Sequence, residues 1–461
     1  MHFEVFRGMS IEVRPPLSNL SAIVGRCLSD QHLGSVLRGA ATAFIINVGA
    51  AAAGYLCHII LARWLGAFEF GIYTFAIAWL MLLAMPATFG MPATTMRFVS
   101  EYLVAGKWPE LRGLLRVGWI VTLVAGIAFS AVSIGIVYVF IDGMAEYHRW
   151  PLTIALAAIP LGALVKLKSE AARAFGWVGL AYVPSQLGHP ILLIIAIFAL
   201  TKFQVGTSAT AMLLATISVF LVVLIWQEVI LRRRLDDRFF MDKALYETKL
   251  WMGVSVPLMF AGGSSIIMTQ ADVILIGVFL DPQQVAYYSA TAKTATFVTF
   301  AFQSIITLAV PKIGELHARD SREELQRLLS SLIHWIFWPA LVAALTLILF
   351  GHWILLLFGP GFETAYLPLV ILVIGQTIHA AVGPVLGLLS MTGHQKLCAK
   401  VFAVSAATNV ILNACLISVA GITGAAIATS TSLVLWNLWL LIVVIRKVGV
   451  NPSLLVPALV R

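Results

Sequence analysis

Charged residues are scarce in this chain. They make up 11% of its 461 residues, whereas soluble globular proteins carry about 25%. Hydrophobic residues account for 60% of the sequence. So few charges exclude an ordinary soluble domain, and the composition instead indicates a protein that resides in the lipid bilayer.

The sequence also lacks the motifs of several catalytic classes. The pattern of a nucleotide-binding P-loop does not occur, HExxH is absent, and "LDDRF" at 235–239 is not a metal-binding DxD motif. The short alternating strands of an outer-membrane barrel are missing as well. We therefore expect no metal or cofactor, and any driving energy would come from an H⁺ or Na⁺ gradient or from the mass action of the substrate. The four cysteines have no metal-ligand spacing and are predicted to be packing residues: Cys27, Cys57, Cys398 and Cys415.

What the chain does contain is long apolar runs. A helix needs about 20 apolar residues to cross about 30 Å of hydrocarbon, because each residue adds about 1.5 Å. Twelve runs reach this length, which predicts an all-α integral membrane protein with twelve transmembrane helices. In the tenth run, Gly383, Pro384 and Gly387 predict close helix packing or a kink. The approximate bounds of the runs are 38–62, 71–96, 114–141, 151–173, 177–200, 208–231, 251–279, 285–309, 331–357, 364–391, 397–419 and 424–445.

The basic residues follow the order of these spans. Of the 30 Lys and Arg residues, 26 lie in the two terminal tails or near the loops that follow even-numbered spans. Arg63, Arg149 and Lys202 lie in the opposite loops, and Lys293 lies within a span. By the positive-inside rule, both termini face the cytoplasm. The net charge of +9 is therefore a signal of topology and does not indicate a nucleic-acid partner.

Two polar segments resemble each other. "SEYLVAGKWPELRGLL" at 100–115 aligns with "GELHARDSREELQRLL" at 314–329, at an offset of 214 residues, and three further echoes follow at offsets of 215 to 217. This pattern predicts a duplication of six spans, and because six is even both halves enter the membrane from the same side. The predicted domains are a cytoplasmic tail (1–37), an N-lobe of spans 1–6 (38–231), a cytoplasmic linker (232–250), a C-lobe of spans 7–12 (251–447) and a cytoplasmic tail (448–461).

Four stretches resemble a known family of transporters. They are "LGAFEFGIY" at 65–73, "GMPATTMRFVSEY" at 90–102, "DVILIGVFL" at 272–280 and "GITGAAIAT" at 421–429. Over about residues 38–447 the chain is similar to the bacterial O-antigen and exopolysaccharide flippases of the multidrug/oligosaccharidyl-lipid/polysaccharide exporter superfamily. Ala286 departs from that family, which more often has glycine there.

The resemblance implies a transporter rather than an enzyme. Such a protein would lie in the inner (cytoplasmic) membrane of a bacterium and carry an undecaprenyl-pyrophosphate-linked glycan from the cytoplasmic to the periplasmic leaflet. Its expected mechanism is alternating access, with the substrate between the lobes, and its expected partners are the lipid-linked glycan, the bilayer and other polysaccharide assembly proteins. An unpaired hydroxyl costs about 4–8 kcal/mol in hydrocarbon, so several sugars need a polar path through the membrane.

Other functions remain open at this stage. A multidrug exporter of the same superfamily would share the architecture, although Lys293 argues against an acidic cavity for cations. Lipid II flippases commonly carry two more spans than this chain shows. A membrane polysaccharide polymerase or glycosyltransferase would need a large soluble loop for its catalytic groups, and every external loop predicted here is short.

Ionisable residues within the spans are the main candidates for a site, because each costs about 2.5–3.5 kcal/mol near a helix centre. Asp272 and Lys293 stand at equal distances from a turn at 282–283, so we expect them at the same depth. They form either a structural ion pair or a coupled site in which Asp272 binds H⁺ or Na⁺ and Lys293 binds pyrophosphate or an acidic sugar. Further candidates for sugar binding, or alternatively for interhelical hydrogen bonds, are Asn47, His189, Gln270, Gln303, Gln376, His379, Asn409 and Asn413.

A group of cations lies at the predicted cytoplasmic mouth. Lys166, Lys168 and Arg173 follow the core of span 4, and Arg97 follows span 2. These residues are expected either to form a solvated helix end or to recruit the pyrophosphate of the substrate.

Overall fold

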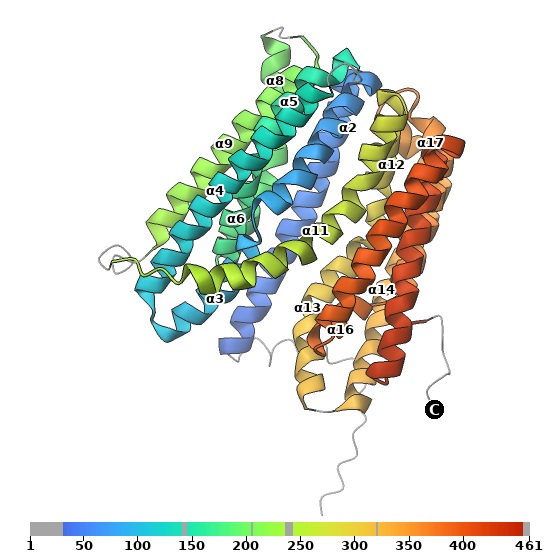
Figure 1. Ribbon diagram of the computed structural model, residues 1–461. Coiled ribbons are helices and arrows are strands. Elements are labelled where there is room, and N and C mark those ends of the chain that lie inside the picture. Colours follow the sequence, from blue (N-terminus) through green and yellow to red (C-terminus); the bar gives the residue numbers. More distant parts are fainter. Residues whose placement is uncertain (1–30, 141–144, 204–205, 236–242, 320, 455–461) are drawn as a thin grey trace, which may run out of the picture.

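The computed structural model describes residues 31–140, 145–203, 206–235, 243–319 and 321–454. Its described residues form helices and connecting turns, with no strand among them. Figure 1 shows two groups of steeply inclined helices joined by α11, which crosses between them. We call α2–α9 the N-lobe and α12–α17 the C-lobe.

The N-lobe begins with one long, bent element. Gly66 interrupts α2 with φ 76°, a conformation that glycine adopts without strain, so the chain reverses there and returns along its own first half. Its helices are α2 (Gln31–Ala87), α3 (Met91–Ala105), α4 (Trp108–Val139), α5 (Glu146–Ala157), α6 (Ile159–Ala174), α7 (Val178–Tyr182), the π-helix η3 (Val183–Gly188), α8 (His189–Lys202) and α9 (Ala209–Arg234).

The last helix of the C-lobe is also interrupted by a glycine. Gly421, at φ 57°, reverses α17 (Gln395–Lys447) in the same way. The connecting helix α11 (Thr248–Phe279) leads into this lobe. The lobe's elements before α17 are α12 (Pro282–Ala295), the 3₁₀ turn η4 (Thr296–Thr299), α13 (Phe300–Ala318), α14 (Arg322–Leu356), η5 (Phe362–Ala365), α15 (Tyr366–Val382) and α16 (Val385–Met391). The break between α15 and α16 falls at Gly383, with φ 82°, followed by Pro384, so the predicted kink is confirmed.

Eight helical stretches of the described residues are long and apolar enough to cross a membrane. Two of them, Ile45–Ala87 and Gln395–Lys447, contain the reversals at Gly66 and Gly421. The predicted second span was too long: the helix ends at Ala87, because Phe89 (φ 52°) and Gly90 (φ 72°) take left-handed conformations, and α3 then starts a new direction.

Both of the repeated polar segments contain a turn between two helices. The first holds the turn between α3 and α4, and the second holds the turn between α13 and α14. Both turns lie at the lower end of the molecule in Figure 1, where the described ends of the chain also lie. The symmetry of the two halves stays a prediction, but the two segments do take the same local form.

At the upper end the lobes meet through direct backbone contact. A Cβ atom on Gly71 of α2 would lie 1.8 Å from the carbonyl oxygen of Pro282, at the start of α12. Another on Gly277 of α11 would lie 2.2 Å from the ring of Phe75. Glycine is therefore required at both positions, because any side chain would hold the helices apart. One apolar core continues across this contact and includes Phe70, Val285 and Phe362.

The first half of α11 is attached to the N-lobe, at the lower end. The Tyr102 hydroxyl donates to Glu247 at 2.6 Å and accepts from the Trp251 indole at 2.9 Å. The Ser255 hydroxyl donates to the carbonyl of Phe89 at 2.5 Å, and Gly90 packs against the Ser255 backbone. The second half of α11 packs on α2 and α17. This single helix therefore belongs to both lobes.

Candidate functional site

A cavity of about 700 Å³ lies inside the C-lobe, between α11–α13 and α15–α17. It falls in the range of about 300–1,000 Å³ that is usual for small-molecule sites. We call it the C-lobe cavity. Five residues predicted from the sequence line it: Asp272, Gln303, Gln376, His379 and Asn409.

Asp272 is held by two hydroxyl groups. Its Oδ2 atom accepts from the Tyr288 hydroxyl at 2.7 Å and from the Thr429 hydroxyl at 2.9 Å. The three residues come from α11, α12 and α17, so the carboxylate joins three helices. Asp272 is 6% exposed and Tyr288 is fully buried. Such a site is costly to build in a membrane, which favours a functional use for the carboxylate.

The second feature of the cavity is an oriented histidine. The Asn437 amide nitrogen donates to the Leu433 carbonyl at 2.7 Å, so its oxygen accepts from Nδ1 of His379, also at 2.7 Å. In the neutral imidazole this leaves Nε2 as an acceptor. Trp436 and Phe302 flank the ring, with centroids at 5.4 and 4.7 Å. The wall is therefore aromatic, with polar groups in fixed positions.

Several buried polar atoms around the cavity have no hydrogen-bond partner in the described part of the chain. They are Oδ1 of Asp272, Oδ1 of Asn409 and Nε1 of Trp436. Buried polar atoms are nearly always satisfied in proteins, by the chain itself, by water or by a ligand. Two acceptors and one donor thus remain for a bound solute, ion or water.

The structure does not join Asp272 and Lys293 in an ion pair, so the predicted structural pair is wrong. The turn between α11 and α12 is centred near Leu280 rather than at 282–283, which brings Tyr288 opposite Asp272. Lys293 lies farther along α12 and is exposed, and the hydroxyl of the next residue, Thr294, forms a 3.0 Å hydrogen bond with the hydroxyl of Tyr55 on α2. It therefore sits where the two lobes meet.

The remaining intramembrane candidates lie apart from the C-lobe cavity. Asn47 is half-buried on α2, and Gln270 donates weakly to the sulfur of Met81 across the lobes at 3.7 Å. His189 stacks near Phe220 within the N-lobe, at 5.0 Å between ring centroids. Asn413 is buried and donates to the carbonyl of Asn409 at 3.0 Å. None of the four is among the residues that line the cavity.

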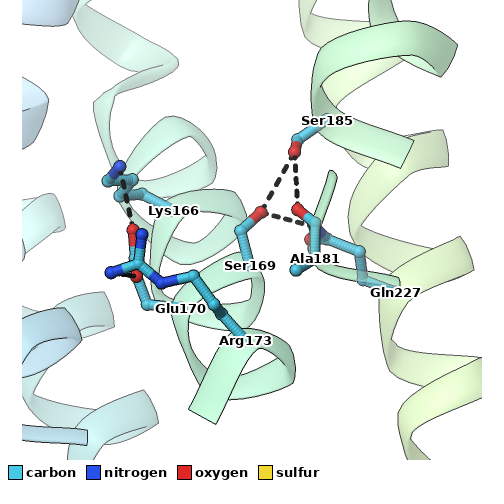
Figure 2. Close-up of polar contacts among 7 residues, drawn as sticks. All are labelled: Lys166, Ser169, Glu170, Arg173, Ala181, Ser185 and Gln227. Atoms are coloured by element: carbon cyan, nitrogen blue, oxygen red, sulfur yellow. Dashed lines mark hydrogen bonds and ion pairs between the residues drawn. The ribbon is translucent and has the colours of Figure 1, made fainter. Parts of the chain in front are cut away.

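Three of the four predicted cations at the mouth form ion pairs with carboxylates. Figure 2 shows Glu170 between Lys166 at 3.1 Å and Arg173 at 2.7 Å. Lys168 pairs with Glu228 of α9 at 2.5 Å. Arg97 is exposed and stacks over the ring of Phe98. This arrangement fits the solvated helix end, and a role in recruiting the substrate stays a prediction.

The same view reveals a polar network that sequence reasoning missed. Ser169 of α6 donates to Ser185 at 3.2 Å and accepts from Gln227 of α9 at 2.9 Å. Ser185 lies in the π-helix η3 and itself donates to the carbonyl of Ala181 at 3.2 Å. Three separate segments of the N-lobe are thereby tied together around a distorted stretch of helix.

Three important residues of the C-lobe cavity were also missed: Tyr288, Thr429 and Trp436. A signal for two of them existed in the sequence. Tyr288 closes the stretch "VAYY" at 285–288, which echoes "FGIY" at 70–73, and Thr429 closes "GITGAAIAT", one of the four stretches that resemble the transporter family. Trp436 carries no such signal, because an isolated tryptophan in an apolar helix is not distinguishable from a packing residue.

Comparison with known proteins identifies the family of the chain. The family model described as "Polysaccharide biosynthesis protein" matches residues 36–317. The chain belongs to this family. It is 26% identical over 396 residues to the probable low-salt glycan biosynthesis flippase Agl15 of Haloferax volcanii, covering 84% of this chain and 79% of the relative.

Two solved structures share the fold of this family member. An inward-facing multidrug resistance MATE family transporter of the MOP superfamily matches with a TM-score of 0.75 at 13% identity, over 87% of this chain and 94% of the other. The lipid II flippase MurJ, in an inward closed conformation, matches with a TM-score of 0.67 at 17% identity, over 87% and 86%. The fold is that of a multi-pass helical membrane transporter.

Proposed function

We propose that the protein is a flippase that moves an undecaprenyl-pyrophosphate-linked oligosaccharide across the cytoplasmic membrane of a bacterium, for surface polysaccharide biosynthesis. Family membership and the glycan biosynthesis flippase among its relatives support this function. That relative is archaeal. The substrate feature common to an archaeal and a bacterial flippase would therefore be a lipid-linked glycan rather than one particular carrier lipid.

The observation that carries the proposal is the C-lobe cavity. It combines aromatic walls with three amide side chains, Gln303, Gln376 and Asn409, and with buried polar atoms that have no partner among the described residues. Sugars present hydroxyl groups at the ring edge and C–H groups on the ring face, so they are complementary to such a lining. A polar pocket at membrane depth is also what the transfer of a glycan requires.

Twelve crossings are our reading of the topology. The reversals at Gly66 and Gly421 divide two of the eight apolar stretches, and α11 and the α12–α13 pair add two more crossings. The loops rich in Arg and Lys lie at the lower end, which we assign to the cytoplasm. The lobes are then in contact on the outer side, which fits the inward-facing phase of alternating access.

Within this scheme Asp272 binds the coupling H⁺ or Na⁺. Either ion would complete the coordination of its buried Oδ1 atom. Lys293, which precedes the Thr294 that contacts α2 at the junction of the lobes, binds the pyrophosphate or an acidic sugar. Because the two residues are not paired, coupling runs through movement of α11 and α12 rather than through direct competition between substrate and ion.

The test is mass spectrometry of undecaprenyl-linked glycans in a deletion strain with the gene restored. We expect completed lipid-linked repeat units to accumulate without the protein and to disappear with it. D272N should restore export poorly, whereas H334F, on the exposed face of α14, should restore it fully. Absence of accumulation would reject the proposal. New sensitivity to cationic drugs would instead favour the multidrug exporter, for which the Asp272 carboxylate in an aromatic cavity is the favourable observation.

A further inference from the structure

A second cavity, of about 940 Å³, lies at the upper end between the two lobes. We call it the upper vestibule. Its N-lobe wall contains Phe75, Tyr147 and His148, and its opposite wall, from the end of α11 to the start of α12, contains Phe279, Asp281 and Gln284. Gly277 and Phe75, which contact each other where the lobes meet, are both part of its lining.

His148 is the unusual residue of this cavity. It is 6% exposed, and neither Nδ1 nor Nε2 has a hydrogen-bond partner among the described residues. Its ring packs between Phe75 and Tyr147, with centroids at 4.7 and 4.6 Å, so the imidazole is held in place by apolar contacts alone. A buried imidazole with both nitrogens unused points to a ligand or water that completes it.

The chemistry of the lining identifies the ligand class. Tyr147 offers an exposed aromatic face, while Asp281 and Gln284 offer acceptors and an amide donor on the opposite wall. A lipid chain would leave these polar groups and His148 unsatisfied, and a phosphate would be repelled by Asp281. A sugar ring satisfies both walls, because its C–H face stacks on an aromatic ring while its hydroxyls donate and accept at the edge.

We propose that the upper vestibule is an exit subsite that binds a sugar of the exported glycan, with His148 as its buried hydrogen-bonding group. This proposal rests on the flippase function and adds a second saccharide site to it. A sugar that touches both walls binds best when the walls are together, so it favours the conformation closed at the upper end. Free glycan outside would therefore oppose further export.

Binding is tested with the full chain in lipid nanodiscs and the free oligosaccharide released by mild acid from the lipid-linked glycan of the producing cells. Saturation-transfer NMR and competition give the affinity. H148F keeps an aromatic ring and removes both nitrogens, so we expect binding about two- to tenfold weaker, equivalent to one lost hydrogen bond. H334F makes the same change at an exposed histidine and should leave binding unchanged. Equal affinity of H148F and H334F would overturn the proposal, as would binding of tetraphenylphosphonium in place of the sugar.

A second readout separates this site from the function as a whole. In wild type, the free oligosaccharide should raise the rate at which a maleimide labels Q376C in the C-lobe cavity, because the lower end is then open for longer. The H148F variant should lose this response, whereas H334F should keep it. Export with no response in wild type would reject the subsite and leave the flippase function intact, whereas failure of the wild-type gene to restore export would reject the function itself.

Discussion

Gly71 gives the sharpest test of how the lobes close. Replacing it with alanine would put a Cβ atom 1.8 Å from the carbonyl oxygen of Pro282 and 2.5 Å from the carbonyl carbon. Ordinary contacts of this kind begin near 3.4 Å, and the obstacle is backbone rather than a flexible side-chain end. The start of α12 must therefore move away by more than an ångström, which the closed upper end cannot absorb without strain.

The size of the effect follows from the cost of overpacking. Inserting a methyl group into a tightly packed contact costs about 1–3 kcal/mol. The strain acts only while the upper end is closed, so G71A shifts the equilibrium toward the open upper end by about five- to 150-fold. Export should slow, because the cycle needs the closed state in order to load substrate from the cytoplasm.

The assay is the rate of maleimide labelling at Q284C in the upper vestibule, in a background without the four native cysteines. We expect G71A to raise this rate. G54A is the matched control, because it makes the same change in the same helix at a position with nothing within 4 Å of the added Cβ. Equal labelling in G71A and the unsubstituted background would refute the reasoning, as would an equal increase in G54A.

Three further predictions concern the supports of the two lobes. R63Q removes the hydrogen bonds from Arg63 to the carbonyls of Leu357, at 2.6 Å, and Leu356, at 3.3 Å, so the maleimide should label Q284C faster. Unchanged labelling would show that these hydrogen bonds do not hold the lobes together at the upper end. S169A leaves the buried Gln227 amide without its partner and should cost about 1–3 kcal/mol of stability, whereas S185A keeps that bond and should cost less; equal melting temperatures would contradict this. Burial raises the pKa of Tyr102 to about 12 from 10.0, so the stability that its protonated hydroxyl confers is complete below pH 10 and is lost as the pH rises through about 12. The Y102F variant should flatten this part of the dependence of stability on pH, which thermal unfolding measures.

Sequence patterns predicted the helical class and five of the polar residues that line the C-lobe cavity, because burying a polar group in a membrane is expensive enough to mark each candidate individually. The sequence predictions were wrong where they depended on the exact residue at which a helix ends or the chain turns. The partner of Asp272 was taken to be Lys293, whereas a turn centred about two residues earlier brings Tyr288 opposite it. The end of the second span was likewise misjudged, because an apolar run does not reveal that Phe89 and Gly90 leave the helical conformation.

The helix α11 connects the two candidate sites. Its first half is fixed to the N-lobe by Trp251 and Ser255, while its second half carries both Asp272 and Gly277. Five residues of helix separate the last two, about 7.5 Å along the axis. The carboxylate that we assign to the coupling ion therefore lies on the same helical segment as the glycine that closes the upper contact. We expect a change at Asp272 that loosens its hydroxyl partners on α12 and α17 to reach that contact along α11 itself.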